Sequence, residues 1–197
     1  MKSKVTKYDI LKLYRNNYNR RIYLREMARE LKKPHQTIKP YLSQLITENV
    51  LIKHKRGKID EYILDIKNEV VPEYLAIAEK EVLIHSLKNA SLLRLIFENL
   101  AEYFNKDNTF IIFGSFIDKK EKAEDIDLLH IGNEKVKNKI KEISNTYNLN
   151  IHLINIEKIK DISNSLLLEI YKKHIILNNS DSFIRRLRNK YGKDILV

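Results

Sequence analysis

FIIFGSFIDKKEKAEDIDLLHI, residues 110–131, decides how the carboxyl-terminal half of this chain folds. Residues 110–113 and 126–131 are short runs rich in aromatic and branched apolar residues with polar residues at their ends, a pattern typical of buried strands. Gly114 and Ser115 follow the first run, and Asp125 and Asp127 stand at the start of the second. The sequence therefore predicts two strands with polar groups gathered at their ends.

These residue types suit a site for a metal-bound nucleotide. A glycine at a strand end permits close backbone approach, and the Ser115 hydroxyl and nearby N–H groups could hold phosphate oxygens. Asp125 and Asp127 are one residue apart, so on a strand both carboxylates point to the same face and can share one hard cation. The alternative is that Asp125 caps the strand, Asp127 is a lone surface carboxylate and Ser115 is an ordinary turn residue.

The segment resembles the nucleotidyltransferases related to DNA polymerase beta, especially the small archaeal and bacterial ones. Gly114 and Ser115 are followed by nine residues and then by Asp125-Ile126-Asp127, as in that family's Gly-Ser and Asp-x-Asp signature. The resemblance covers residues 101–190 and implies a mixed sheet covered by helices, Mg²⁺ or Mn²⁺, and a nucleoside triphosphate. It also implies that Gly114, Ser115 and Lys119 contact the nucleotide.

Enzymes of this family use a third carboxylate from a later strand. The matching strand here is residues 149–156, where the alternation places His152 in the position of that acid. A neutral imidazole can ligate Mn²⁺ or accept a proton, but it carries no negative charge for Mg²⁺. The resemblance assigns Asp125, Asp127 and His152 to the catalytic position, with Glu157 as a substitute acid, and it leaves activity uncertain because the third acid is missing.

Positive charge is concentrated in the amino-terminal third. Residues 1–65 hold 16 of the 37 Lys and Arg and only 7 of the 26 Asp and Glu, which is +9 of the formal net charge of +11. Such localisation is typical of a surface that meets phosphates.

The same third has helix-turn-helix patterning. Apolar residues at spacings of three and four predict helices near residues 8–13, 24–31 and 38–46, with a break at residues 32–34. Residues 51–54 and 59–64 predict a hairpin that turns at residues 55–58, and residues 22–24 could pair with it. Pro40 is expected to bend the third helix or delay its start.

This pattern resembles the winged helix-turn-helix of archaeal and bacterial transcription regulators. The resemblance implies that the third helix enters the major groove and that the hairpin, or wing, lies on the phosphates. Gln36 and Gln44 are the expected base readers. The full set of expected DNA-contacting residues is His35, Gln36, Thr37, Lys39, Ser43, Gln44, Lys53, Lys55, Arg56 and Lys58.

A helical segment over residues 70–104 connects the two parts. Its apolar stripe packs either on the transferase-like part or on a second chain, and we favour a homodimer. The predicted fold is α+β, with a winged helix-turn-helix at 1–66, a helical connector at 67–105 and a nucleotidyltransferase-like domain at 106–197.

Composition adds general limits. The 197 residues contain no cysteine, which excludes disulfides, and neither a signal peptide nor a long apolar run is present, so a cytoplasmic protein is expected. The leading interpretation is a regulator of transcription that binds double-stranded DNA and whose second domain binds a metal-nucleotide with impaired catalysis. The alternatives are an active Mg-dependent enzyme that transfers a nucleoside monophosphate to a protein or nucleic acid, and an antitoxin-like role.

Overall fold

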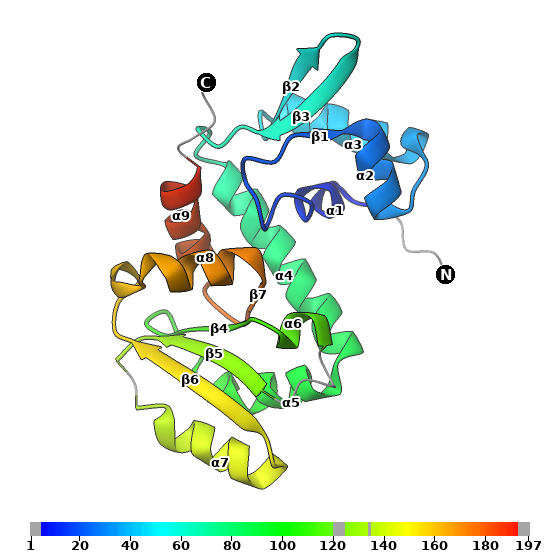
Figure 1. The fold of residues 1–197 in the computed structure, drawn as a ribbon. Coiled ribbons are helices and arrows are strands. Elements are labelled where there is room, and N and C mark those ends of the chain that lie inside the picture. The colour runs from blue at the N-terminus through cyan, green and yellow to red at the C-terminus, as the bar shows by residue number, and fades with distance from the viewer. Residues whose placement is uncertain (1–4, 120–124, 134, 193–197) are drawn as a thin grey trace. The chain divides into compact units, whose positions relative to one another are not determined.

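A computed structural model describes residues 5–119, 125–133 and 135–192 of the chain (Figure 1). The chain forms two compact units, the first comprising Met1–Ala78 with Ile184–Val197 and the second Glu79–Phe183. The boundary between the units falls within α4 (Val71–Asn89), in the segment expected to be a helical connector. The predicted α+β class is confirmed.

The first unit contains the three predicted helices and a small antiparallel sheet. The helices are α1 (Lys7–Leu11), α2 (Leu24–Leu31) and α3 (His35–Thr47), and the strands are β1 (Ile22–Tyr23), β2 (Leu51–Arg56) and β3 (Ile59–Leu64). The strand order is β1-β3-β2, so the short run before α2 does pair with the hairpin. The hairpin turns through Gly57, whose φ of +61° is readily adopted by glycine.

Apolar residues of the three helices and of the strands form the core of this unit. Apolar residues at helical spacing on α1, α2 and α3 are fully buried, and so are Ile22 and Leu51, the first residues of β1 and β2. The Tyr14 hydroxyl lies inside this core and donates a 2.9 Å hydrogen bond to the Tyr62 carbonyl, and burial raises the pKa of that hydroxyl. The buried apolar set includes Ile10, Leu11, Met27, Ile38, Leu42, Leu45 and Leu51.

Pro40 lies inside α3 without delaying its start, contrary to one of the two expected effects. The helix begins at His35 and continues to Thr47. Pro40 is exposed, and the helical hydrogen bond that it cannot donate would go to the carbonyl of Gln36, which is also exposed. Water can therefore satisfy that carbonyl, which limits the cost of the proline.

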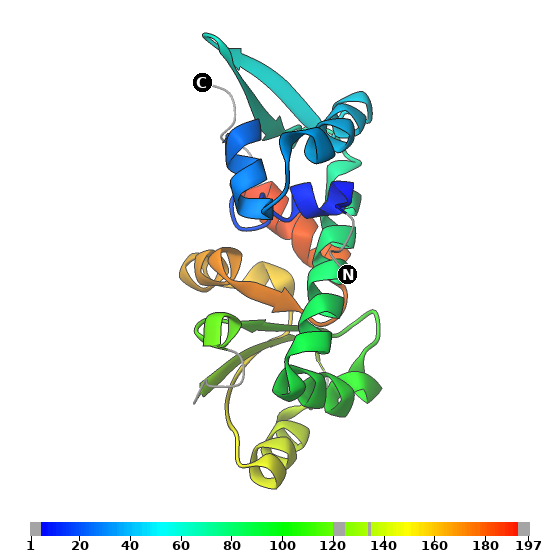
Figure 2. The ribbon, with the colours of Figure 1, turned by 90° about the vertical axis from the view of Figure 1, so that its right-hand side faces the viewer.

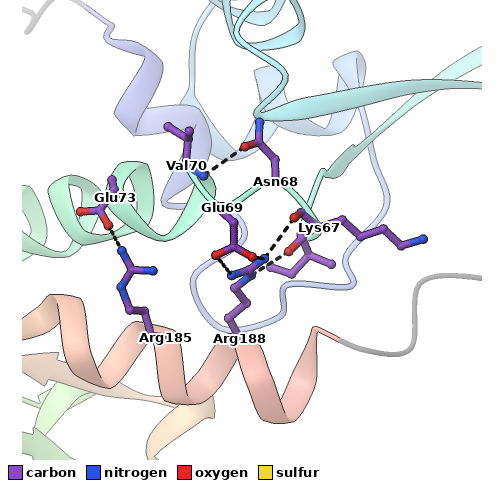
Figure 3. A network of polar contacts seen from close by, with 8 residues as sticks. Lys67, Asn68, Glu69, Val70, Glu73, Arg185 and Arg188 are labelled. Carbon is purple, nitrogen blue, oxygen red and sulfur yellow. Dashed lines mark hydrogen bonds and ion pairs between the residues drawn. The ribbon is translucent and has the colours of Figure 1, made fainter.

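The carboxyl-terminal helix α9 (Ser180–Tyr191) completes the first unit from Ile184 onward. Figure 3 shows Arg188 at the centre of a polar network: its guanidinium contacts both Glu69 carboxylate oxygens at 2.7 and 2.8 Å, and it also donates to the carbonyls of Ile66 and Lys67. One turn earlier, Arg185 pairs with Glu73. Residues more than 100 positions apart in sequence are thus joined within one unit.

The second unit is a four-stranded mixed sheet with helices on both faces. Its strands are β4 (Thr109–Phe113), β5 (Asp125–Ile131), β6 (Asn150–Ile156) and β7 (His174–Ile176), in the order β6-β5-β4-β7. β5 and β6 are parallel, and the other pairs are antiparallel. The helices are α5 (Ser91–Leu100), α6 (Phe116–Lys119), α7 (Lys137–Tyr147) and α8 (Asn164–Lys172), together with the second half of α4 (Val71–Asn89) and the 3₁₀ turns η1 (Ala101–Tyr103) and η3 (Ile159–Asp161).

Alternation along the strands separates the two faces of the sheet. Phe110, Ile112, Ile126 and Leu128 pack in one cluster with residues of α5 and α7. Figures 1 and 2 show α5 and α7 on this face and α8 on the opposite one. Along β5, Asp125 and Asp127 alternate with Ile126 and Leu128 of this cluster, so the two aspartates lie on the opposite face, which α8 covers.

Candidate functional site

The turn after β4 brings a glycine against a carboxylate. Gly114 has φ +74°, and a Cβ built on it would lie 2.6 Å from Oδ2 of Asp127. Any other residue would therefore be strained in backbone and would collide with the Asp127 carboxylate. Ser115 follows with an exposed side chain and leads directly into α6. Of the predicted Gly-Ser turn and Asp pair, the structure brings Gly114 and Asp127 together.

Asp125 and Asp127 point to the same face of β5, next to matching residues of β6. Asp125 lies opposite Asn150 in the parallel register, and Asp127 lies opposite His152. The Asn150 side-chain amide donates to Asp125, and Nδ1 of His152 is 3.3 Å from Oδ1 of Asp127. The Asp127 side chain is 29% exposed and that of His152 is 69% exposed, so solvent and ligands can reach both.

His152 occupies the position where the resemblance implies a third acid. The parallel register places it directly beside Asp127. Glu157, the substitute expected from the sequence, comes after the last residue of β6 and is exposed. In the described ranges, no three His, Asp or Glu side chains gather closely enough to hold a metal ion.

The donor set fits one hard cation better than two. Mg²⁺ in phosphate sites is commonly held by one or two carboxylates together with water and substrate phosphates. Asp125 and Asp127 supply two carboxylates on one face, while His152 contributes a nitrogen that Mg²⁺ does not favour. A cation held here would bring a nucleotide's phosphates toward the Gly-Ser turn by neutralising their charge.

An open pocket of about 350 Å³ borders the Gly-Ser turn on the α8 side. Gly114 and Ser115 line it together with residues that the sequence reasoning missed: Asp118, Glu169, Lys172 and Lys173. Both lysines are exposed, and Lys173 pairs with Asp118. The side chain of Lys119, the basic residue expected to contact phosphates, lies outside the described residues.

The expected DNA-contacting residues form the exposed surface of α3 and the hairpin. All ten are exposed, while Ile38, Leu42 and Leu45 on the opposite side of α3 are buried. Gln44, an expected base reader, donates a 2.9 Å hydrogen bond to Glu48. Its amide is therefore already bonded to the residue that caps the end of α3. Gln36 lies in the first turn of α3, and in helix-turn-helix proteins the N-terminal residues of the recognition helix are the ones that contact bases.

Two cations of the hairpin, and Arg21 just before β1, are paired with acids of β3. Lys53 is 2.8 Å from Asp60, and Arg56 and Arg21 reach the enclosed Glu61 at 3.3 and 3.4 Å. The hydrogen bond from Tyr23, followed by those from Arg56 and Arg21, holds the pKa of Glu61 below its ordinary value. For Lys39, Lys55 and Lys58, the described part of the chain supplies no ion-pair partner, so their charges face solvent.

No helix among the described residues is long and apolar enough to cross a membrane. No family model matches the chain, and no curated protein matches it. One solved structure, of a mutant MntA-HpeT toxin-antitoxin protein, is similar at 12% identity and a TM-score of 0.38, over 48% of this chain and 82% of that one. This weak neighbour does not define a function for the present chain.

Proposed function

We propose that this protein is a double-stranded-DNA-binding regulator whose second unit binds a metal-nucleotide and has lost efficient transfer. The observation that supports DNA binding best is the shared exposure of ten polar and basic residues on α3 and the hairpin. The proposal of a winged helix-turn-helix is further supported by the order of elements in the first unit, in which three helices are followed by a hairpin. In that arrangement α3 reads the major groove and Lys55 and Lys58 contact phosphates.

The test is the salt dependence of DNA affinity, measured with the full chain and a fluorescent duplex. A reader of duplex phosphates should lose affinity steeply with salt, and each phosphate contact contributes about 0.9 to the slope of log K against log salt. Lys55→Glu should lower both the affinity and the slope. Lys106→Glu makes the same charge change at an exposed position of the second unit and should leave both nearly unchanged. An equal loss in both variants would refute a specific DNA face.

Nucleotide binding is supported by the close approach of Gly114 to Asp127, and by the position of Asp125 on the same face of β5. The expected occupant is a nucleoside triphosphate with one Mg²⁺ or Mn²⁺. The cation would be held by Asp125 and Asp127, and Ser115 would contact the phosphates. Calorimetry with Mg-ATP and Mg-GTP should give binding that Asp127→Asn abolishes and EDTA removes. Absence of binding by the folded wild-type chain would exclude this part of the proposal.

The second candidate function is an active nucleotidyltransferase. It is favoured by the close contact between Gly114 and Asp127, which keeps the Gly-Ser turn against a carboxylate. In such a reaction an acceptor hydroxyl attacks the α-phosphorus, a new P–O bond forms, and pyrophosphate leaves while the hydroxyl proton passes to a base. His152, beside Asp127 and exposed, is the available base.

His152→Asp separates the two candidates. If the missing acid is what limits the site, this change should increase Mg-nucleotide affinity and produce transfer of label from an α-labelled triphosphate to an acceptor. If His152 is instead the working base, the wild type should already transfer label and His152→Asp should alter its pH profile. A homodimer through α4 and α5, also proposed, is tested independently by sedimentation.

A further inference from the structure

The edge strand β6 carries an unusual combination of features. Its seven residues, NIHLINI, include no Lys, Arg, Asp or Glu, and it is the outermost strand next to β5. No strand within the described ranges pairs with its other edge. Natural sheets usually protect an edge with charged residues, with a very short strand or with a covering element. The opposite edge follows that rule, because β7 has only three residues.

A groove runs between this edge and α7. It has a volume of about 720 Å³, and its apolar lining comes from Val136 and Ile140 of the α7 side and from Ile151 and Leu153 of β6. Ile151 and Leu153 pack against the core cluster of this unit but are only half-buried. Apolar surface is thus left open beside unpaired backbone groups.

The rim of the groove is basic. Lys135, Lys137 and Lys141 line it and are all exposed, and its remaining polar lining consists of asparagines and one serine. None of the described lining residues is acidic. A second copy of this chain, paired edge to edge, would bring two such sets of lysines together, and like charges facing each other disfavour that pairing.

The groove is separate from the candidate nucleotide site. Ile151, Leu153 and Asn155 line the groove, and they alternate along β6 with Asn150 and His152, which contact the aspartates. Successive side chains of a strand point to opposite faces, so the two sites lie on opposite faces of the sheet.

We propose that this groove binds an acidic, extended segment of a partner protein, which adds to β6 as a further strand. The backbone of the segment would pair with the free edge of β6, its apolar side chains would cover Ile151 and Leu153, and its carboxylates would meet the three lysines. Strand addition of this kind obtains affinity from main-chain hydrogen bonds and specificity from alternate side-chain pockets. The inference is independent of the proposed function.

The test uses blocked, fluorescent seven-residue peptides and the full chain. A peptide that alternates glutamate with valine should bind saturably, with an affinity that falls as salt rises. A peptide that alternates lysine with valine should not bind. The double change Lys137→Glu and Lys141→Glu should raise the Kd about tenfold, since it reverses two rim charges. The matched double change Lys88→Glu and Lys106→Glu, at exposed positions away from the groove, should leave the Kd within twofold.

Backbone NMR of the bound chain distinguishes strand addition from simple attraction to lysines. Strand addition should shift and protect the amides of residues 150–156. Shifts confined to α7, binding of the basic peptide, or equal weakening by the two double variants would each overturn the proposal. Salt-sensitive self-association through β6, detected by sedimentation without peptide, would assign the groove to a second copy instead and would also overturn it.

Discussion

Replacing Gly114 by alanine should damage the candidate nucleotide site through two separable effects. The first is backbone strain, because the residue has φ +74°. Holding a non-glycine residue in this region costs about 1–2 kcal/mol. The second is a collision, because the new Cβ would lie 2.6 Å from Oδ2 of Asp127. Oδ2 is the far end of a side chain that is 29% exposed, so the carboxylate can turn away, and leaving its rotamer costs about 0.5–1.5 kcal/mol.

Two further variants isolate each effect. Gly57 has φ +61° with nothing within 4 Å of its Cβ position, so Gly57→Ala measures strain without collision. Asp127→Ala removes the carboxylate, so Gly114→Ala made in that background should cost about 1–2 kcal/mol, the strain alone. The difference between the two backgrounds is the coupling between residues 114 and 127.

Urea denaturation followed by circular dichroism gives the free energies of unfolding. Mg-nucleotide calorimetry shows whether a displaced Asp127 also weakens binding. The expected result is a larger loss of stability for Gly114→Ala than for Gly57→Ala, and a smaller loss when Asp127 is absent. Equal costs of Gly114→Ala in both backgrounds would refute the argument that the turn is pressed against the carboxylate.

Two further expectations concern the first unit. Tyr23, Arg56 and Arg21 lower the pKa of Glu61 in the folded protein. The ionised Glu61 should therefore stabilise the fold fully above its ordinary pKa of 4.5, and this stabilisation should be lost as pH falls through the lower pKa of the folded state. The difference in urea midpoint between the wild type and Glu61→Gln should accordingly vanish in acid. Arg188→Met should destabilise the unit by about 1.5–3 kcal/mol, since it removes charged hydrogen bonds from a side chain that is 13% exposed. Arg185→Met is the matched control: this more exposed arginine forms a single pair, whose loss should cost at most about 1 kcal/mol in the same thermal or urea melts.

Local patterns in the sequence were sufficient to predict most of the elements. Spacings of three and four placed α2, α3 and the helices after Val71, and the short apolar runs placed β4, β5 and β6. Gly57 marked the hairpin turn, although β2 continues to Arg56, two residues beyond the predicted end. These features depend on neighbours within about one turn or one strand, which is the range over which periodicity carries information.

Contacts between distant segments were not predictable in the same way. Glu69 and Arg188 come together only because α9 returns to the first unit, and nothing near either residue indicates this pairing. Lys172 and Lys173 reach the Gly-Ser turn because β7 pairs with β4, with His174 opposite Phe113. The sequence indicated the chemistry of Asp125 and Asp127, but Asn150 became relevant only once the parallel register with β6 was known.

One strand, β6, serves both proposed sites of the second unit, and this makes the two proposals separable by experiment. His152 lies on the face with Asp127, whereas Leu153 lies on the face with the lysine-rimmed groove. A side-chain change on one face need not disturb the other, because the backbone of β6 is held in register by β5. His152→Asp should therefore alter nucleotide affinity while leaving the acidic peptide's Kd unchanged, and reversing Lys137 and Lys141 should do the opposite. If either change weakened both ligands equally, the two faces of β6 would not be independent, and the assignment of the two ligands to opposite faces would be refuted.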